Sequence, residues 1–124
     1  MKSAELVIKG SKVIGVGYRP FLLLNAMYLG VEKFSAFNAR EEDQETVIVR
    51  MQGEDRIIIQ CIDFIRSNFP EQAIVEEVTE RGFEGLVMDA DKFRKILQFE
   101  QISKAVTAII SIDKKLSESK SKIS

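Results

Sequence analysis

Two glycines and an arginine stand close together near the start of the chain, in the stretch Val13-Ile14-Gly15-Val16-Gly17-Tyr18-Arg19-Pro20. Glycines allow backbone N–H groups to gather around one point, and an arginine at the start of a helix adds a positive charge there. This combination suits the binding of an anion such as phosphate. We therefore predict a phosphate-binding loop made by Gly15, Val16, Gly17, Tyr18 and Arg19.

The chain of 124 residues contains no histidine and one cysteine, Cys61. Without histidine, the commonest general base, the Ser-His and Cys-His nucleophile pairs and the usual catalytic zinc sites are excluded. A single cysteine makes neither an internal disulfide nor a cysteine-only metal site. An enzyme with this composition must use positioning, arginine or lysine charge, carboxylates or backbone donors, and we expect no metal and no cofactor.

The overall composition is that of one compact globular domain, with 45% hydrophobic and 30% charged residues. The formal net charge of −1 argues against binding to nucleic acid or to an anionic membrane. No apolar run approaches the roughly 20 residues of a membrane span. The first five residues do not resemble a secretory signal, so we expect a cytoplasmic protein.

Alternating runs of apolar residues predict the order strand, helix, strand, strand, helix, strand. This order predicts an α+β fold of the ferredoxin-like βαββαβ type, with two helices on one face of an antiparallel sheet. The charged stretch 39–45 is expected to form a hairpin loop, and 86–88 a short fifth strand at the edge. The predicted strands cover 5–9, 31–38, 46–52 and 73–78, and the helices cover 20–29 and 54–69.

Within these helices, Gly30 is expected to end the first in a left-handed conformation. The second is expected to bury a stripe that includes an unreactive thiol. The members of this stripe are Ile58, Cys61, Ile62, Ile65 and Phe69. The first helix has no charged residue between Arg19 and Glu32, so a covering element is expected on its outer side as well.

After residue 88 the pattern changes to apolar residues at spacings of three and four, which predicts a long amphipathic helix with a polar tail over 117–122. We therefore divide the chain into a domain at 1–88 and a helical extension at 89–124. This helix packs on its own domain in one interpretation. In the other, it forms a homodimer by pairing with a second copy.

With this order in place, the stretch Val13-Ile14-Gly15-Val16-Gly17-Tyr18-Arg19 resembles the phosphate-binding loop of the acylphosphatase family, Val-Gln-Gly-Val-Gly-(Phe/Tyr)-Arg. The Tyr18-Arg19-Pro20-Phe21 continuation is similar to the acylphosphatase domain of hydrogenase-maturation carbamoyltransferases. The similarity continues through Leu29-Gly30, Asn38 and Gly53. It ends with Pro70, Ala73, Val75 and Val78, and so covers roughly residues 6 to 78.

The resemblance implies hydrolysis of the carboxyl–phosphate bond of small acyl phosphates, without metal or covalent intermediate. It implies that Arg19 and the loop N–H groups hold the phosphate and that the amide of Asn38 orients the attacking water. Three features depart from the family pattern: Ile14 replaces the loop glutamine, an acidic run replaces the usual turn after Asn38, and the glycine before the loop is displaced by one residue, at Gly10. They support the alternative of an inactive or weakly active anion-binding regulatory module that assembles through its C-terminal helix.

Overall fold

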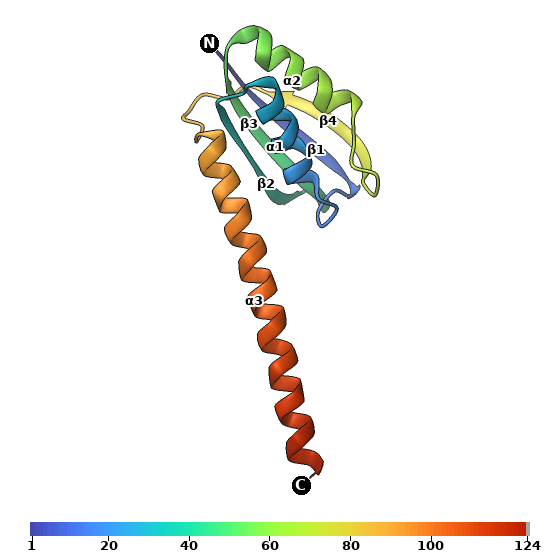
Figure 1. Cartoon of the computed structure of the whole chain (residues 1–124). Coiled ribbons are helices and arrows are strands. Elements are labelled where there is room, and N and C mark those ends of the chain that lie inside the picture. The colour runs from blue at the N-terminus through green and yellow to red at the C-terminus, as the bar shows by residue number, and fades with distance from the viewer. Residues whose placement is uncertain (124) are drawn as a thin grey trace. The chain divides into compact units, whose positions relative to one another are not determined.

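The structure is a computed structural model that describes residues 1–123, and the side chains of residues 1–115. The chain divides into two compact units, Met1–Phe93 and Arg94–Ser124. The first unit contains a four-stranded antiparallel sheet in the order β2-β3-β1-β4, with α1 and α2 on one face (Figure 1). This confirms the predicted βαββαβ fold. The elements are β1 (Lys2–Lys12), α1 (Tyr18–Leu29), β2 (Lys33–Glu41), β3 (Gln44–Gly53), α2 (Asp55–Ser67), β4 (Ile74–Arg81) and α3 (Ala90–Ile123).

The core of the first unit lies between the helices and the face of the sheet that they cover, here called the helix side. Side chains alternate between faces along a strand, so residues two apart share a side. The helix side of β1, β2 and β3 is almost fully buried, and apolar burial of this extent stabilises the fold. Its buried members are Ala4, Leu6 and Ile8 on β1, Phe34 and Ala36 on β2, and Val47, Val49 and Met51 on β3.

The two helices pack against each other through Phe21 and Phe64, whose ring centroids are 5.5 Å apart. α1 ends as predicted: Gly30 has a φ of 85°, and the N–H of Val31 donates to the carbonyl of Ala26 at 2.8 Å. Along α2, Ile58, Cys61, Ile62 and Ile65 are buried as expected. Phe69 was wrongly included in this stripe, because the helix ends at Ser67 and Phe69 is exposed.

Two predicted boundaries also differ from the structure. The strands on either side of the charged hairpin are longer than expected, so the turn itself contains only Glu42 and Asp43. The stretch 86–88 forms no strand. Its neighbourhood instead makes one bridge between Lys33 and Asp89, with the N–H of Phe34 donating to the carbonyl of Met88 at 2.9 Å.

Gly10 lies inside β1, where the neighbouring strand β4 passes unusually close. A Cβ atom at this position would lie 2.0 Å from the carbonyl oxygen of Ile74, which no side chain tolerates. The register between β1 and β4 shifts at this point, as it does at a β-bulge. Gly10 therefore allows β1 to continue to Lys12 and to lead into the loop before α1.

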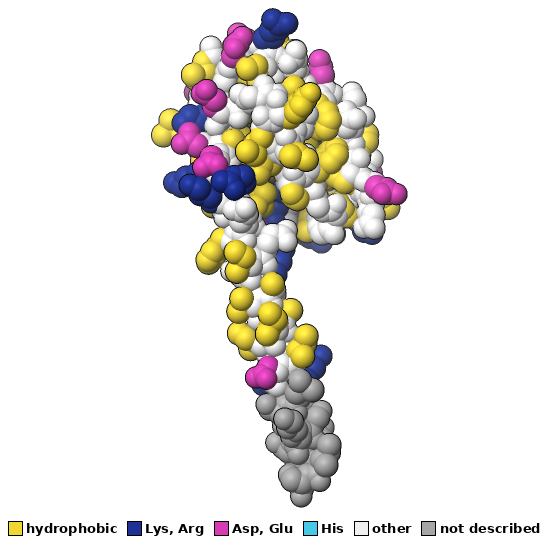
Figure 2. Space-filling model, in the orientation of Figure 1, with side chains coloured by type: hydrophobic (Ala, Val, Ile, Leu, Met, Phe, Trp, Pro, Cys, Tyr) yellow, Lys and Arg dark blue, Asp and Glu magenta, His cyan; other side chains and the backbone are white. Residues whose placement is uncertain are grey.

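The outer side of α1 carries large apolar side chains that are exposed: Leu24 is 73% exposed and Tyr28 is 87% exposed. Figure 2 shows hydrophobic side chains on the visible surface of the domain and along α3. The expectation that another element covers α1 stays a prediction. Within residues 1–123, no helix is both long and apolar enough to cross a membrane.

The second unit consists of helix alone, because α3 continues without interruption to Ile123. Phe99, Ile102, Val106 and Ile109 are all exposed, at 71%, 62%, 49% and 65% respectively. Their spacing of three, four and three residues places them along one stripe of the helix. The predicted polar tail at 117–122 lies beyond the described side chains.

Candidate anion-binding site

The loop between β1 and α1 takes its shape from two glycines. Gly15 has a φ of 76° and Gly17 a φ of 74°, both in the left-handed region that glycine adopts without steric cost. Gly17 is the residue before α1, and its carbonyl accepts the N–H of Phe21 at 3.1 Å in the first turn. The loop thus curls around the amino end of a helix, where backbone N–H groups and the helix dipole favour an anion.

Tyr18 and Arg19 both lie in the first turn of α1, but their side chains have different surroundings. Tyr18 is 2% exposed, and its ring contacts that of Phe21 edge to face, with centroids 6.1 Å apart. Burial raises the pKa of the Tyr18 hydroxyl to about 12. The Arg19 side chain is half-buried and keeps some accessible surface. Tyr18 therefore anchors the loop in the core, and Arg19 places a positive charge at the helix start.

Asn38 was expected to end its strand, but β2 continues to Glu41, so Asn38 lies within it. It is opposite Val47 in β3. It shares the helix side of the sheet with Phe34 and Ala36, but it is exposed where they are buried. Among the described residues, its side-chain amide makes no hydrogen bond. β1 and β2 run in the same direction on either side of β3, so Asn38 and the loop share one side and one end of the sheet.

Sequence reasoning missed Glu45, which the structure places against the loop. One oxygen of its carboxylate, Oε1, accepts the backbone N–H of Ile14 at 2.9 Å and of Val13 at 3.1 Å. These two hydrogen bonds lower the pKa of the Glu45 carboxyl, the bond from Ile14 having the larger effect. The alternation of β3 contained the signal, because Glu45 has the same parity as Val47, Val49 and Met51 and so belongs to the helix side.

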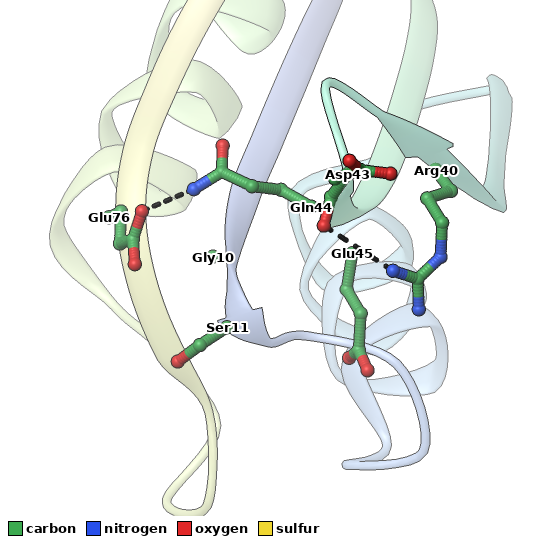
Figure 3. A pocket seen from close by; sticks show the side chains of 7 residues that line it. All are labelled: Gly10, Ser11, Arg40, Asp43, Gln44, Glu45 and Glu76. Atoms are coloured by element: carbon green, nitrogen blue, oxygen red, sulfur yellow. Dashed lines mark hydrogen bonds between the residues drawn. The ribbon is translucent and has the colours of Figure 1, made fainter.

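A hollow of about 320 Å³ lies beside this contact, at the end of the sheet (Figure 3). Two hydrogen bonds join residues that line it: Arg40 donates to the carbonyl of Asp43 at 3.3 Å, and the Gln44 amide donates to Glu76. All of the lining is polar or glycine. The lining residues are Gly10, Ser11, Arg40, Asp43, Gln44, Glu45 and Glu76.

Two other carboxylates of the hairpin, Glu41 and Glu42, contact Lys9 on the open side of the sheet. Lys9 is 3.6 Å from Glu41 and 3.5 Å from Glu42, and Arg81 forms an ion pair with Glu41. Hydrogen bonding and charge from Arg81, with help from Lys9, lower the pKa of Glu41. Glu45 binds the loop, whereas Glu41 and Glu42 contact Lys9 instead. Among the side chains that the structure describes, no group of three or more from His, Cys, Asp or Glu is arranged to hold a metal ion.

Comparison with known proteins agrees with this geometry. The sequence model of the acylphosphatase family matches residues 4–94. A crystal structure of full-length HypF in the phosphate- and nucleotide-bound form is similar to this chain, with 25% identity and a TM-score of 0.56. The similarity covers 67% of this chain but only 10% of that protein, so the two share one domain.

Two smaller solved structures are also similar. An acylphosphatase from Bacillus subtilis has 18% identity and a TM-score of 0.49, with 71% of this chain and 94% of that one covered. An acylphosphatase from Coxiella burnetii has 23% identity and a TM-score of 0.47, with 70% and 84% covered. A search of curated proteins found no match.

Proposed function

Because this chain belongs to the acylphosphatase family, whose sequence model matches residues 4–94, we propose that it hydrolyses the carboxyl–phosphate bond of small acyl phosphates such as acetyl or carbamoyl phosphate. One observation carries the proposal within the structure. The left-handed glycines of the loop, the first turn of α1 with Arg19, and the exposed amide of Asn38 lie at one end of the sheet on one side.

The loop supplies the binding half of the mechanism. Backbone N–H groups from Gly15 to Arg19 hold the phosphate oxygens at the positive end of the helix, and the Arg19 guanidinium matches two of these oxygens with its planar fork. The helix dipole disfavours a cation at the start of a helix, and an anion bound there would offset this effect on Arg19. Charge that develops on the phosphate during the reaction is stabilised by the same donors.

Asn38 supplies the positioning half. Its exposed side-chain amide holds a water molecule beside the bound substrate. The carboxylic–phosphoric anhydride is already an activated bond, so orientation and charge stabilisation suffice without a strong general base. Water adds and the carboxyl–phosphate bond breaks, which gives a carboxylate and inorganic phosphate.

Hydrolysis of a synthetic acyl phosphate tests this proposal, with Arg19→Ala and Asn38→Ala compared with the wild type. We expect losses in kcat/KM of about 10²-fold or more for Arg19→Ala and of about 10²-fold for Asn38→Ala. Arg56→Ala and Gln60→Ala, both exposed on α2, are matched controls and should retain full activity. No hydrolysis by the wild type, or unchanged hydrolysis in both site variants, would contradict the proposal.

The exposed stripe of α3 favours a second candidate, an anion-binding module that assembles as a homodimer through this helix. Phe99, Ile102, Val106 and Ile109 follow the three-four spacing of a heptad repeat, which fits a second helix with the same spacing. Apolar residues that alternate at spacings of three and four form the seam along which two helices pair. In this candidate, the loop binds phosphate without turnover.

The oligomeric state, measured by light scattering at tens of micromolar protein, tests the second candidate. We expect a dimer that Val106→Glu converts to a monomer, because a charge in the middle of the stripe opposes pairing. Ser111→Glu adds the same charge on the opposite side of α3 and should leave the dimer intact. A monomeric wild type would exclude this assembly, and phosphate binding without hydrolysis by a dimer would favour the module over the enzyme.

A further inference from the structure

Glu45 occupies a place in the sheet from which a carboxylate can reach the loop. In the register of the strands it is opposite Gly10 of β1 on one side and opposite Arg40 of β2 on the other. Gly10 has no side chain and cannot be replaced by a residue that has one, because β4 passes too close. The Glu45 side chain therefore has no competing neighbour from β1, and Figure 3 shows it extending from the hairpin toward the loop.

The two N–H groups that Glu45 binds have no partner in the sheet, because β1 ends at Lys12, just before them. A single oxygen accepts both, at 3.1 Å from Val13 and 2.9 Å from Ile14. Hydrogen bonds to an ionised carboxylate are stronger than those between neutral groups. Glu45 follows its two partners by 32 and 31 positions in the sequence. The contact therefore ties the start of the loop to the β2–β3 hairpin.

The contact also divides the donors of the loop into two sets. The N–H groups of Val13 and Ile14 donate to the protein's own carboxylate. Those that begin at Gly15, the first left-handed glycine, are the ones proposed to bind a ligand. The same carboxylate brings a negative charge near the place proposed for phosphate. Glu45 thus has two opposing effects on an anion, since its hydrogen bonds order the loop and its charge repels the ligand.

We propose that Glu45 is a positioning residue that holds the anion-binding loop in its ligand-ready shape from the β2–β3 hairpin, at the cost of weaker anion affinity. This inference rests on the proposed role of the loop. Arg40 and Lys12 supply the positive charges that act on Glu45, and Asp43 and Glu76 are the other carboxylates that line the adjacent hollow. Glutamine at position 45 keeps an acceptor oxygen without the charge, so it separates the two effects.

Amide hydrogen exchange in the ligand-free protein tests the positioning role without reference to phosphate or turnover. We expect Glu45→Ala to accelerate exchange at Val13 and Ile14 at least tenfold, and Glu45→Gln to retain most of their protection. Glu84→Gln, which removes an exposed charge after the far end of β4, is the control and should change neither amide. Unchanged exchange at both amides in a folded Glu45→Ala protein would overturn the proposal.

Titration with inorganic phosphate, followed by amide chemical shifts, tests the effect on the ligand. We expect Glu45→Gln to bind phosphate several-fold more tightly than the wild type and Glu45→Ala to bind it more weakly. Equal changes in both variants would mean that charge alone matters and would overturn the positioning role. A wild type that binds no phosphate would instead contradict the proposed function, and the exchange result would still decide whether Glu45 holds the loop.

Discussion

Glu41 and Glu45 belong to the same hairpin, but they act on opposite sides of the sheet. Glu41 lies on the open side, where Arg81 and Lys9 form ion pairs with it, and Glu45 lies on the helix side, where it binds two backbone N–H groups. The difference follows from the register of the hairpin. Glu41 is opposite Gln44 across the two-residue turn and shares its side of the sheet, so the next residue, Glu45, points to the other side. An acidic sequence near an anion site therefore does not imply an acidic site, because strand parity directs each carboxylate to its own side.

The two sides of the sheet are also held together by different interactions. The helix side is an apolar core, whereas the open side combines a few buried apolar residues, such as Val7 and Ile48, with charged groups and rings. Arg50 donates to Glu5 at 2.8 Å, and its guanidinium lies between the rings of Phe37 and Phe83, 5.0 Å and 4.7 Å from their centroids. Cation–π contacts of this kind fasten the segment after β4 to the open side. The helix side should consequently dominate stability.

The largest effect is expected from Phe34→Ala on the helix side. Phe34 is fully buried and its ring lies 5.9 Å from that of Phe93, so the truncation leaves a cavity and should lower the free energy of unfolding by about 3–5 kcal/mol. Phe37→Ala is the matched variant on the open side, where the ring is 36% exposed, and should cost much less. Urea unfolding measures both, and equal losses would contradict the difference between the sides.

A smaller effect is expected from Lys9→Met on the open side. The Lys9 side chain is 10% exposed and lies near Glu41 and Glu42, so losing its charge should cost about 1 kcal/mol at pH 7. The folded-state pKa of Glu41 is lowered by Arg81 first and by Lys9 as well. This stabilisation is present above the ordinary carboxyl pKa and is lost as the pH falls through the lowered value. The difference between the two proteins in urea unfolding should therefore shrink as the pH falls below the ordinary carboxyl pKa. A constant difference would indicate a loss of packing.

The smallest effect is expected from Tyr18→Phe at neutral pH. Within the described part of the chain the buried hydroxyl has no hydrogen-bond partner, so its removal should be neutral or stabilise by up to about 1 kcal/mol. Burial raises the folded-state pKa of Tyr18 from 10.0 to about 12. Below pH 10 the hydroxyl is neutral in both states and folding stability does not depend on its titration. As the pH rises from 10 toward 12, the unfolded chain ionises this hydroxyl before the folded protein does, so the folded protein loses stability.

Replacement by phenylalanine should accordingly protect the protein from unfolding between pH 10 and 12. Unfolding midpoints at pH 8 and pH 11 measure the effect. The matched control is Tyr28→Phe, since this other tyrosine of the chain is 87% exposed and should behave like the wild type. Equal alkaline behaviour of the two variants would show that the buried hydroxyl is not responsible.

The element order, the left-handed end of α1 at Gly30 and most of the α2 stripe were predictable, because periodicity and helix-ending signals are local. The length of the hairpin was not. Arg40, Glu41 and Gln44 have weak strand preference and became strand through pairing with the facing strand, for example Arg40 with Glu45. Glu42 and Asp43 adopt φ values of 53° and 61° without the glycine or asparagine that signals such a turn.

In the candidate site, too, features set by local sequence were predictable and contacts between distant segments were not. The loop was predicted from its local pattern, whereas Asn38 and the roles proposed for both came from the resemblance to the family. Glu45 was missed because its partners, the N–H groups of Val13 and Ile14, carry no side-chain signal and lie more than 30 positions away. The parity of β3 could have directed attention to it once the position of the turn was known.

The close approach of Gly10 to Ile74 has a consequence for how the protein acquires its site. β1 is an inner strand, paired on one side with β3 and on the other with β4, whose residues follow it by more than 60 positions. Contacts between such distant segments form late, because closing a long loop costs chain entropy before any pairing compensates for it. During synthesis, β1 is made before β4, so its second edge stays unpaired until β4 has left the ribosome. The loop that follows β1 is thus made well before the strand that completes its support.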